Sequence, residues 1–328
     1  MTTVRPEGSV GEVVAALRGW LDGPDDVRLV VETSGSTGVP KRVLLSKAAV
    51  LASVAATERR LGAAGRWVLV LPPSYVAGVQ VICRSLVAGH EPVTEWPGEG
   101  TWFTSLVPTQ LLRLLHSDDD LAALRTAHTI LLGGGPIDPQ LRARANDEGL
   151  RVVATYGSAE TAGGCVYDGM PLDGVALAIG TEGRIRIAGP TLFDGYEGDP
   201  ELTASALVDG WFLTSDAGRL DDDGRLTVLG RVDDMVVSGG VNIPAPAVAA
   251  RLRRHPDVAD AEVLGVPDPE WGQRVVAFVV GRLDLDAARE WVADEHPRAW
   301  APREVVVLDA IPRLGNGKPD RLALAELA

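Results

Sequence analysis

The sequence predicts an α/β fold: a large N-terminal α/β domain with a small β subdomain, followed by a small C-terminal α+β domain. Apolar, strand-like runs alternate with helix-like segments from residue 29 to residue 154, a pattern typical of a largely parallel sheet. Short strands and turns fill residues 174–229, and a new set of helices and strands follows. We therefore expect one domain over residues 1–232 and a second over 233–328.

Local signals predict the elements of the first domain. Ser46 is placed to cap a helix over residues 47–61 that ends near Gly62. Residues 78–88 form a mostly apolar helix, and Pro108 opens another. Because loops at the carboxyl ends of parallel strands carry ligands in such folds, the strand ends are where we expect a site. The strand candidates are 29–31, 43–45, 67–71, 102–107, 129–132 and 152–154.

The second domain has its own alternation of elements, typical of a compact α+β unit. Its final loop carries Lys318. The expected elements are a helix after Pro244, strands over 261–266 and 274–280, a helix over 285–295 and a strand over 304–308.

Composition excludes several function classes. The chain has 328 residues and a formal net charge of −14, which argues against binding nucleic acid or an anionic membrane. We find no run of about 18 apolar residues and no signal-peptide core, so we expect no membrane insertion and a cytoplasmic protein. Cys83 and Cys165 lie far apart without metal-ligand spacing, which predicts free thiols.

A glycine- and hydroxyl-rich loop between the first two strand candidates indicates phosphate binding. Its glycines let backbone N–H groups approach an anion, its hydroxyls donate to phosphate oxygens, and its lysine adds charge. A Walker loop is excluded, because Pro40 precedes the lysine and a strand follows it. A simple hairpin turn is the alternative. The loop comprises Thr33, Ser34, Gly35, Ser36, Thr37, Gly38, Val39, Pro40 and Lys41.

Lysine usage favours a function for this loop. Lys41, Lys47 and Lys318 are the only lysines in the sequence, and the first and last of these close glycine-rich loops. In such loops a slim ammonium can enter a space that a planar guanidinium cannot.

Two later strand ends carry further candidates. The strand over 129–132 runs into Gly133, Gly134, Gly135 and Pro136, which can lie flat against a planar base. The next strand runs into residues 155–161, where Tyr156 offers an aromatic face and Glu160 a carboxylate suited to Mg²⁺. Taken singly, each of these loops has an ordinary explanation as a turn or a strand end.

With these loops in this order, the sequence resembles the adenylate-forming superfamily of acyl-CoA synthetases, nonribosomal adenylation domains and luciferases. The resemblance covers nearly the whole chain and is carried by residues 33–41, 156–160, Asp216, 230–234 and 317–318. It implies that Lys318, Lys41 and Glu160 are catalytic, that Glu160 holds Mg²⁺, and that Asp233 is a hinge for the second domain. The ATP-binding residues that it implies are Thr33, Ser34, Gly35, Ser36, Thr37, Gly38, Lys41, Gly133, Gly134, Gly135, Pro136, Thr155, Tyr156, Gly157, Asp216 and Arg231.

Three stretches, 78–89, 105–111 and 160–169, more closely resemble the o-succinylbenzoate:CoA ligases of menaquinone biosynthesis. This implies an aryl acid, ATP, Mg²⁺ and coenzyme A as ligands. The implied acid-binding residues are Arg84, Ser105, Thr109 and Gly163. A CoA ligase for another aryl acid and a non-catalytic adenylate-binding relative stay open as alternatives, since Ala159 replaces the usual Thr or Ser and the segment before the phosphate loop is short. A homodimer also stays open.

Arg84 is the specificity candidate, because its apolar helix turns it towards the core, where a buried guanidinium needs an anion. An internal salt bridge would make it structural. A substrate carboxylate would make it the anchor for the acid.

Overall fold

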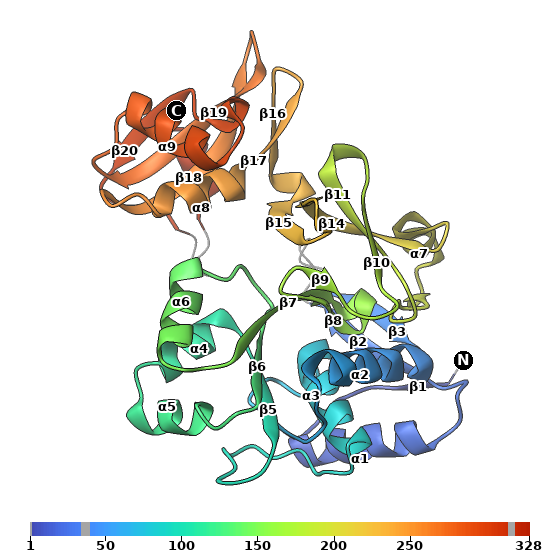
Figure 1. Ribbon diagram of the computed structural model, residues 1–328. Coiled ribbons are helices and arrows are strands. Elements are labelled where there is room, and N and C mark those ends of the chain that lie inside the picture. Colours follow the sequence, from blue (N-terminus) through green and yellow to red (C-terminus); the bar gives the residue numbers. More distant parts are fainter. Residues whose placement is uncertain (1, 34–39, 314–318) are drawn as a thin grey trace. The chain divides into compact units, whose positions relative to one another are not determined.

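The computed structural model describes residues 2–33, 40–313 and 319–328 (Figure 1). The chain forms two compact units. Unit 1 comprises Met1–Ala178, Arg186–Leu213 and Asp221–Leu226, and unit 2 comprises Ile179–Ile185, Thr214–Leu220 and Thr227–Ala328. The predicted boundary at residue 233, between an ATP- and acid-binding domain and a mobile domain, stays a prediction. So does the hinge at Asp233.

A six-stranded sheet forms the centre of unit 1, in the order β4-β5-β6-β7-β8-β9. Neighbours from β4 to β7 are parallel, whereas β7, β8 and β9 pair antiparallel. These strands confirm the predicted α/β fold. Their bounds are Arg66–Val68 (β4), Trp102–Leu106 (β5), Thr129–Leu132 (β6), Val152–Ser158 (β7), Gly163–Tyr167 (β8) and Met170–Pro171 (β9).

Helices lie on both sides of this sheet, with α2 and α3 on one side of β5 and β6 and α4 to α6 on the other (Figure 1). Ser46 caps α2 through the N–H of Ala49, as predicted, and Gly62 ends it in the left-handed conformation. Trp102, Ile130 and Leu132 pack with apolar side chains of α4 and α5. The helices are α2 (Lys47–Leu61), α3 (Val76–Val87), α4 (Pro108–Leu114), α5 (Asp118–Leu124), α6 (Pro139–Asp147) and the short η1 (Ala159–Thr161).

The two strands that flank the glycine-rich loop lie outside the parallel sheet. They pair antiparallel, with Thr33 opposite Lys41, in a separate sheet of order β1-β2-β3-β12. The physical reason is length, because a parallel crossover needs a dozen or more residues and this loop is shorter. The elements are β1 (Thr3–Val4), α1 (Val10–Asp22), β2 (Arg28–Thr33), β3 (Lys41–Leu45) and β12 (Gly195–Tyr196).

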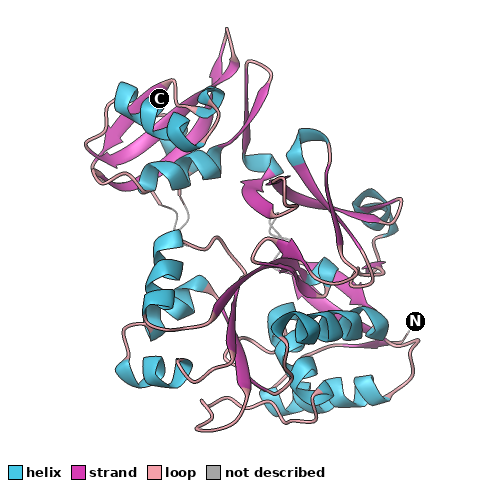
Figure 2. Ribbon diagram, in the orientation of Figure 1, coloured by secondary structure: helices cyan, strands magenta, loops and turns pink. Residues whose placement is uncertain are grey.

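The predicted small β subdomain is a five-stranded sheet of order β10-β11-β14-β13, with β15 beside β14. Figure 2 shows it as the strand-rich part of the chain that follows β9. Its elements are β10 (Ala176–Ile179), η2 (Thr181–Gly183), β11 (Arg184–Ala188), α7 (Pro200–Ala206), β13 (Leu207–Val208), β14 (Trp211–Leu220) and β15 (Leu226–Arg231).

The part of unit 2 from η3 onward is the predicted α+β domain. Its sheet has the order β17-β16-β19-β18, with β20 parallel to β19, and Val248, Leu252 and Val292 pack in its core. Within the described residues, no helix is long and apolar enough to span a membrane. The elements are η3 (Val232–Asp234), β16 (Met235–Ser238), β17 (Val241–Pro244), α8 (Ala245–Arg253), β18 (Val258–Asp268), β19 (Gly272–Gly281), α9 (Leu285–Glu295), η4 (Arg298–Trp300), β20 (Glu304–Leu308) and α10 (Arg321–Ala325).

Candidate active site

A cavity of about 110 Å³ lies in unit 1, between α3 and the ends of β5, β6 and β7. Such strand ends are where α/β folds bind their ligands. The cavity brings together seven of the residues predicted for the acid and for ATP, although they come from five separate parts of the sequence. These seven are Arg84, Ser105, Gly133, Gly134, Thr155, Gly157 and Gly163.

Two of the glycines are required by close approach between strands. A Cβ on Gly133 would lie 2.3 Å from the Thr155 Oγ1, and one on Gly157 would lie 2.2 Å from the Gly163 carbonyl oxygen. Any side chain at either position would force the strand ends apart. The glycines therefore keep this edge of the sheet closed and leave their own part of the cavity wall without side chains.

Arg84 reaches this cavity from α3 and is only 5% exposed, as its apolar helix predicts. Its guanidinium carbon lies 4.9 Å from the centre of the Trp67 ring, and its Nη2 donates to the Tyr167 hydroxyl at 3.4 Å. Its Nε is buried without a hydrogen-bond partner. Among the described residues no carboxylate forms an ion pair with Arg84, so its guanidinium brings an unpaired positive charge to the wall of the cavity.

Two further cavity residues, Gln80 and Tyr167, are not among the sequence candidates. Gln80 is 1% exposed, and its amide nitrogen donates to the Ala162 carbonyl oxygen at 2.7 Å. This bond holds the left-handed turn that precedes Gly163. The Gln80 Oε1 is buried without a partner. The Tyr167 hydroxyl lies 3.0 Å from the Thr57 hydroxyl. The sequence signal for Gln80 was a polar residue inside an apolar run, whereas Tyr167 had no comparable signal.

A second polar cluster in unit 1 joins Lys41, at the start of β3, with Glu160 in η1. Glu160 is 8% exposed, and its Oε1 accepts a hydrogen bond from the Tyr196 hydroxyl at 2.8 Å. The Lys41 ammonium lies 5.4 Å from the centre of the same tyrosine ring. Burial and the nearby Glu160 carboxylate raise the pKa of Tyr196 above its ordinary value, so the phenol stays protonated and donates. Tyr196 is not among the residues predicted from the sequence, because it stands outside every motif quoted above.

Several predicted residues do not line the cavity. Thr109, Gly135 and Pro136 are exposed, and the predicted loop residues Ser34, Gly35, Ser36, Thr37 and Gly38 and the catalytic candidate Lys318 lie outside the described residues. Tyr156 follows Thr155 on β7 and is half-buried. Asp216 and Arg231 belong to unit 2, where Arg231 lies 3.9 Å from the Asp233 carboxylate. Their roles stay predictions.

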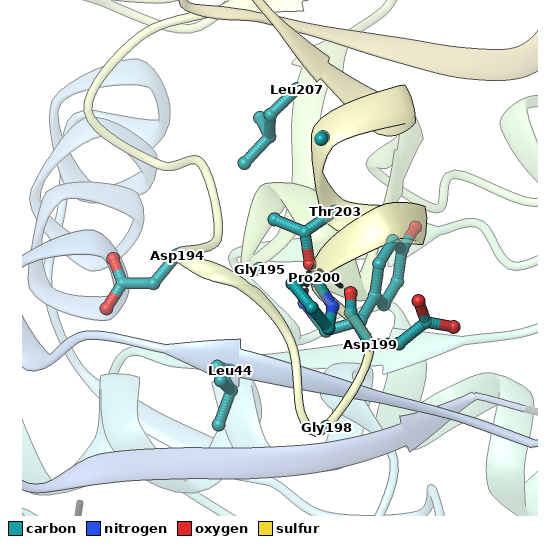
Figure 3. A pocket seen from close by; sticks show the side chains of 10 residues that line it. Leu44, Asp194, Gly195, Gly198, Asp199, Pro200, Thr203 and Leu207 are labelled. Atoms are coloured by element: carbon teal, nitrogen blue, oxygen red, sulfur yellow. Dashed lines mark hydrogen bonds between the residues drawn. The ribbon is translucent and has the colours of Figure 1, made fainter.

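A larger, open hollow of about 390 Å³ also lies in unit 1 (Figure 3). Leu44 of β3 forms one wall, and residues between Asp194 and Leu207, Tyr196 among them, form the rest. It contains none of the residues predicted from the sequence. The smaller cavity is therefore the candidate site, since it holds seven of the predicted residues, Arg84 among them.

Residues 16–197 match the family model described as AMP-binding enzyme, and residues 247–318 match the AMP-binding enzyme C-terminal domain. The chain belongs to the AMP-binding enzyme family. This result confirms the predicted resemblance to adenylate-forming enzymes, and the first match extends through β10 and β11 of the small β subdomain.

Individual relatives carry more specific names. A Mycobacterium tuberculosis protein named "Probable 2-succinylbenzoate--CoA ligase" is 44% identical over 95% of this chain and 87% of the relative. A feruloyl-CoA synthase from Amycolatopsis is 33% identical over 90% of this chain and 69% of the relative. The solved o-succinylbenzoate CoA synthetase from Bacillus subtilis, in complex with the acyl-adenylate intermediate OSB-AMP, superposes with a TM-score of 0.73 at 27% identity, covering 90% of this chain and 68% of that one.

Proposed function

We propose that this chain is an AMP-forming acid–CoA ligase that converts o-succinylbenzoate, ATP and coenzyme A into o-succinylbenzoyl-CoA, a step of menaquinone biosynthesis. The observation that carries the proposal is Arg84, a guanidinium buried in the candidate cavity without a carboxylate partner among the described residues. A buried positive charge is costly unless an anion meets it. The names of the relatives support the same acid.

The substrate has two carboxylates, and the proposal gives each a role. The ring carboxylate pairs with Arg84, beside Ser105, while the succinyl carboxylate attacks the α-phosphorus of ATP. That attack forms the acyl-adenylate and releases pyrophosphate. The coenzyme A thiol then attacks the acyl carbonyl, and AMP leaves. Because anions are brought together in the first step, positioning and charge neutralisation supply most of the catalysis.

Lys41 and Glu160 fit the phosphate end of this reaction. Lys41 supplies a positive charge for the phosphates of ATP. Mg²⁺ in nucleotide sites is bound by one or two carboxylates together with phosphates and water, so the single Glu160 carboxylate suits it, and the bound ion would supply further charge neutralisation. The described residues contain no group of three or more His, Cys, Asp or Glu that would hold a metal ion by themselves.

Lys318 completes the proposal as the residue that bridges the substrate carboxylate and the α-phosphate during adenylation, with Asp233 as the hinge. We expect Lys318→Ala to reduce adenylate formation by roughly 100-fold or more, the cost of losing one charged donor to a transition state. The same variant should still convert added acyl-adenylate and coenzyme A to thioester. Pyrophosphate exchange and thioester formation are the two measurements. Equal losses in both would contradict a role for Lys318 in the adenylation step alone.

The direct test of the function uses the purified chain with ATP, Mg²⁺, coenzyme A and o-succinylbenzoate. We expect equal amounts of AMP and thioester, measured by liquid chromatography and mass spectrometry. Ferulate and benzoate serve as competing acids, because the similarity to a feruloyl-CoA synthase makes another aryl acid the second candidate substrate. A higher specificity constant for ferulate would overturn the substrate assignment, and no AMP with any acid would favour a non-catalytic adenylate-binding protein.

A further inference from the structure

Lys41 and Glu160 carry opposite charges in one small region of unit 1, yet neither forms an ion pair with any described residue. Tyr196 contacts both. Its hydroxyl donates to Glu160 at 2.8 Å, and its ring lies 5.4 Å from the Lys41 ammonium. A single side chain of β12 therefore satisfies the carboxylate with its polar end and the ammonium with its face.

The position of Tyr196 is fixed by its own segment. Its backbone N–H donates to the Thr203 Oγ1 at 2.8 Å, and β12 pairs with β3 so that Tyr196 lies opposite Val43. Figure 3 shows Thr203 of α7 directed towards this segment. Gly195 makes the approach possible, since a Cβ there would lie 2.7 Å from the Thr203 methyl group.

The same segment also holds the backbone of η1. The Phe193 N–H donates to the Glu160 carbonyl oxygen at 2.9 Å, and the Phe193 ring meets the Tyr196 ring edge-on at 4.9 Å. Glu160 is therefore held twice, through its main chain by Phe193 and through its carboxylate by Tyr196. Together these two contacts fix both the position of the Glu160 backbone and the direction of its carboxylate.

From these contacts we infer that Tyr196 is a positioning residue that keeps Lys41 and Glu160 apart and available for magnesium–ATP. The phenol hydroxyl occupies Oε1 of Glu160 and leaves Oε2 for a cation. The ring holds the ammonium in place of a direct ion pair with Glu160. Without the tyrosine, the two charges would neutralise each other, because an ammonium and a carboxylate at contact attract strongly in a partly buried site. This inference rests on the proposed function, since it assigns Glu160 to Mg²⁺.

Two substitutions test the hydroxyl and the ring of Tyr196 separately. Tyr196→Phe removes the hydroxyl and keeps the ring, so we expect roughly a tenfold loss of affinity for magnesium–ATP, the size of one hydrogen bond to a charged group. Its affinity for ATP without metal should be unchanged. Tyr196→Leu removes both contacts and should weaken ATP binding with and without metal. Titration calorimetry without acid or coenzyme A measures these affinities, and thermal unfolding checks that each variant is folded.

A double-mutant cycle with Glu160→Gln decides whether Tyr196 acts through Glu160. We expect Tyr196→Phe to cost little further magnesium–ATP affinity once Glu160 is Gln, because the hydroxyl then has no carboxylate to orient. Fully additive losses, an unchanged affinity in Tyr196→Phe, or an equal loss without metal would each overturn the inference. If the wild-type chain shows no magnesium dependence of ATP binding, the metal role of Glu160 fails first and the positioning role falls with it.

Discussion

Two buried arginines, one in each unit, both lie against a tryptophan ring but differ in their anions. Arg84 of α3 is 5% exposed and stacks at 4.9 Å on Trp67, and Arg251 of α8 is 3% exposed and stacks at 3.8 Å on Trp291. Arg251 forms ion pairs with Asp294 at 3.2 Å and with Glu295 at 2.8 Å. Arg84 has no such partner among the described residues and lines a cavity instead.

The difference separates an arginine whose charge is balanced by carboxylates of the chain from one for which we propose a ligand. Both guanidiniums gain from the face of a tryptophan, which is worth about 0.5–2 kcal/mol and does not replace an anion. Arg251 obtains its anions from α9, so its charge is already balanced. Arg84 has a buried Nε without a hydrogen-bond partner and lines the cavity, and we propose that the acid supplies its carboxylate.

The largest effect that tests this comparison is expected for Arg84→Ala. Removing one partner of a buried charge pair costs roughly 2–5 kcal/mol, or about 30-fold to several thousand-fold in kcat/KM for o-succinylbenzoate. The KM for ATP should scarcely change. The control substrate is an analogue that lacks the ring carboxylate, on which the variant and the wild type should perform alike. Equal losses on both acids would show that Arg84 holds the fold.

A smaller effect is expected for Gln80→Glu, which gives Arg84 the kind of partner that Arg251 already has. Residues four apart on a helix share one face, so the new carboxylate would compete with the substrate for the guanidinium. We expect roughly a 10- to 100-fold loss of kcat/KM for the dicarboxylic acid, about the strength of one charged hydrogen bond. Gln80→Leu is the matched control, because it also loses the bond to Ala162 without adding charge. If Gln80→Leu loses as much activity on this acid, charge competition is not the cause.

Arg251→Ala should change stability and leave acid selectivity as it is. We expect about 1–2 kcal/mol of lost unfolding free energy, since the packing of the side chain on Trp291 disappears while Asp294 and Glu295 remain partly in water. Urea unfolding followed by tryptophan fluorescence measures the loss. The ratio of kcat/KM for the two acids should match the wild type, and a shift in that ratio would remove the contrast between the arginines.

The smallest effect concerns pH. Hydrogen bonding to Arg254, and then the charge of Arg251, lower the pKa of Glu295 below its ordinary value of 4.5. A carboxyl whose pKa is lower in the folded state stabilises the protein above pH 4.5, and this contribution is lost as the pH falls through the folded-state pKa. Because Glu295 is partly exposed, we expect less than about 1 kcal/mol. Glu295→Gln should reduce the dependence of the unfolding free energy on pH below pH 4.5. An unchanged slope would show that the Glu295–Arg254 pair does not contribute.

Local sequence signals determined where several elements of this chain begin and end. The helices at Lys47–Leu61 and Leu285–Glu295 and the strands at Thr129–Leu132 and Glu304–Leu308 have the predicted bounds. Caps such as Ser46, and the period of the apolar residues, act over a few neighbouring positions, so a single sequence is enough to read them. The order of the glycine-rich loops likewise sufficed to identify the family.

Only the tertiary structure decided which side chains meet. Glu160 and Tyr196 are 36 positions apart in the sequence, and Arg84 and Tyr167 are 83 apart, so no local period links them. The sequence predicted that Arg84 is buried but left open whether a carboxylate of the chain would pair with it, because that depends on which elements pack against α3. Whether a buried charge belongs to the fold or to a ligand is set by its neighbours in space, and these follow from packing of the whole unit.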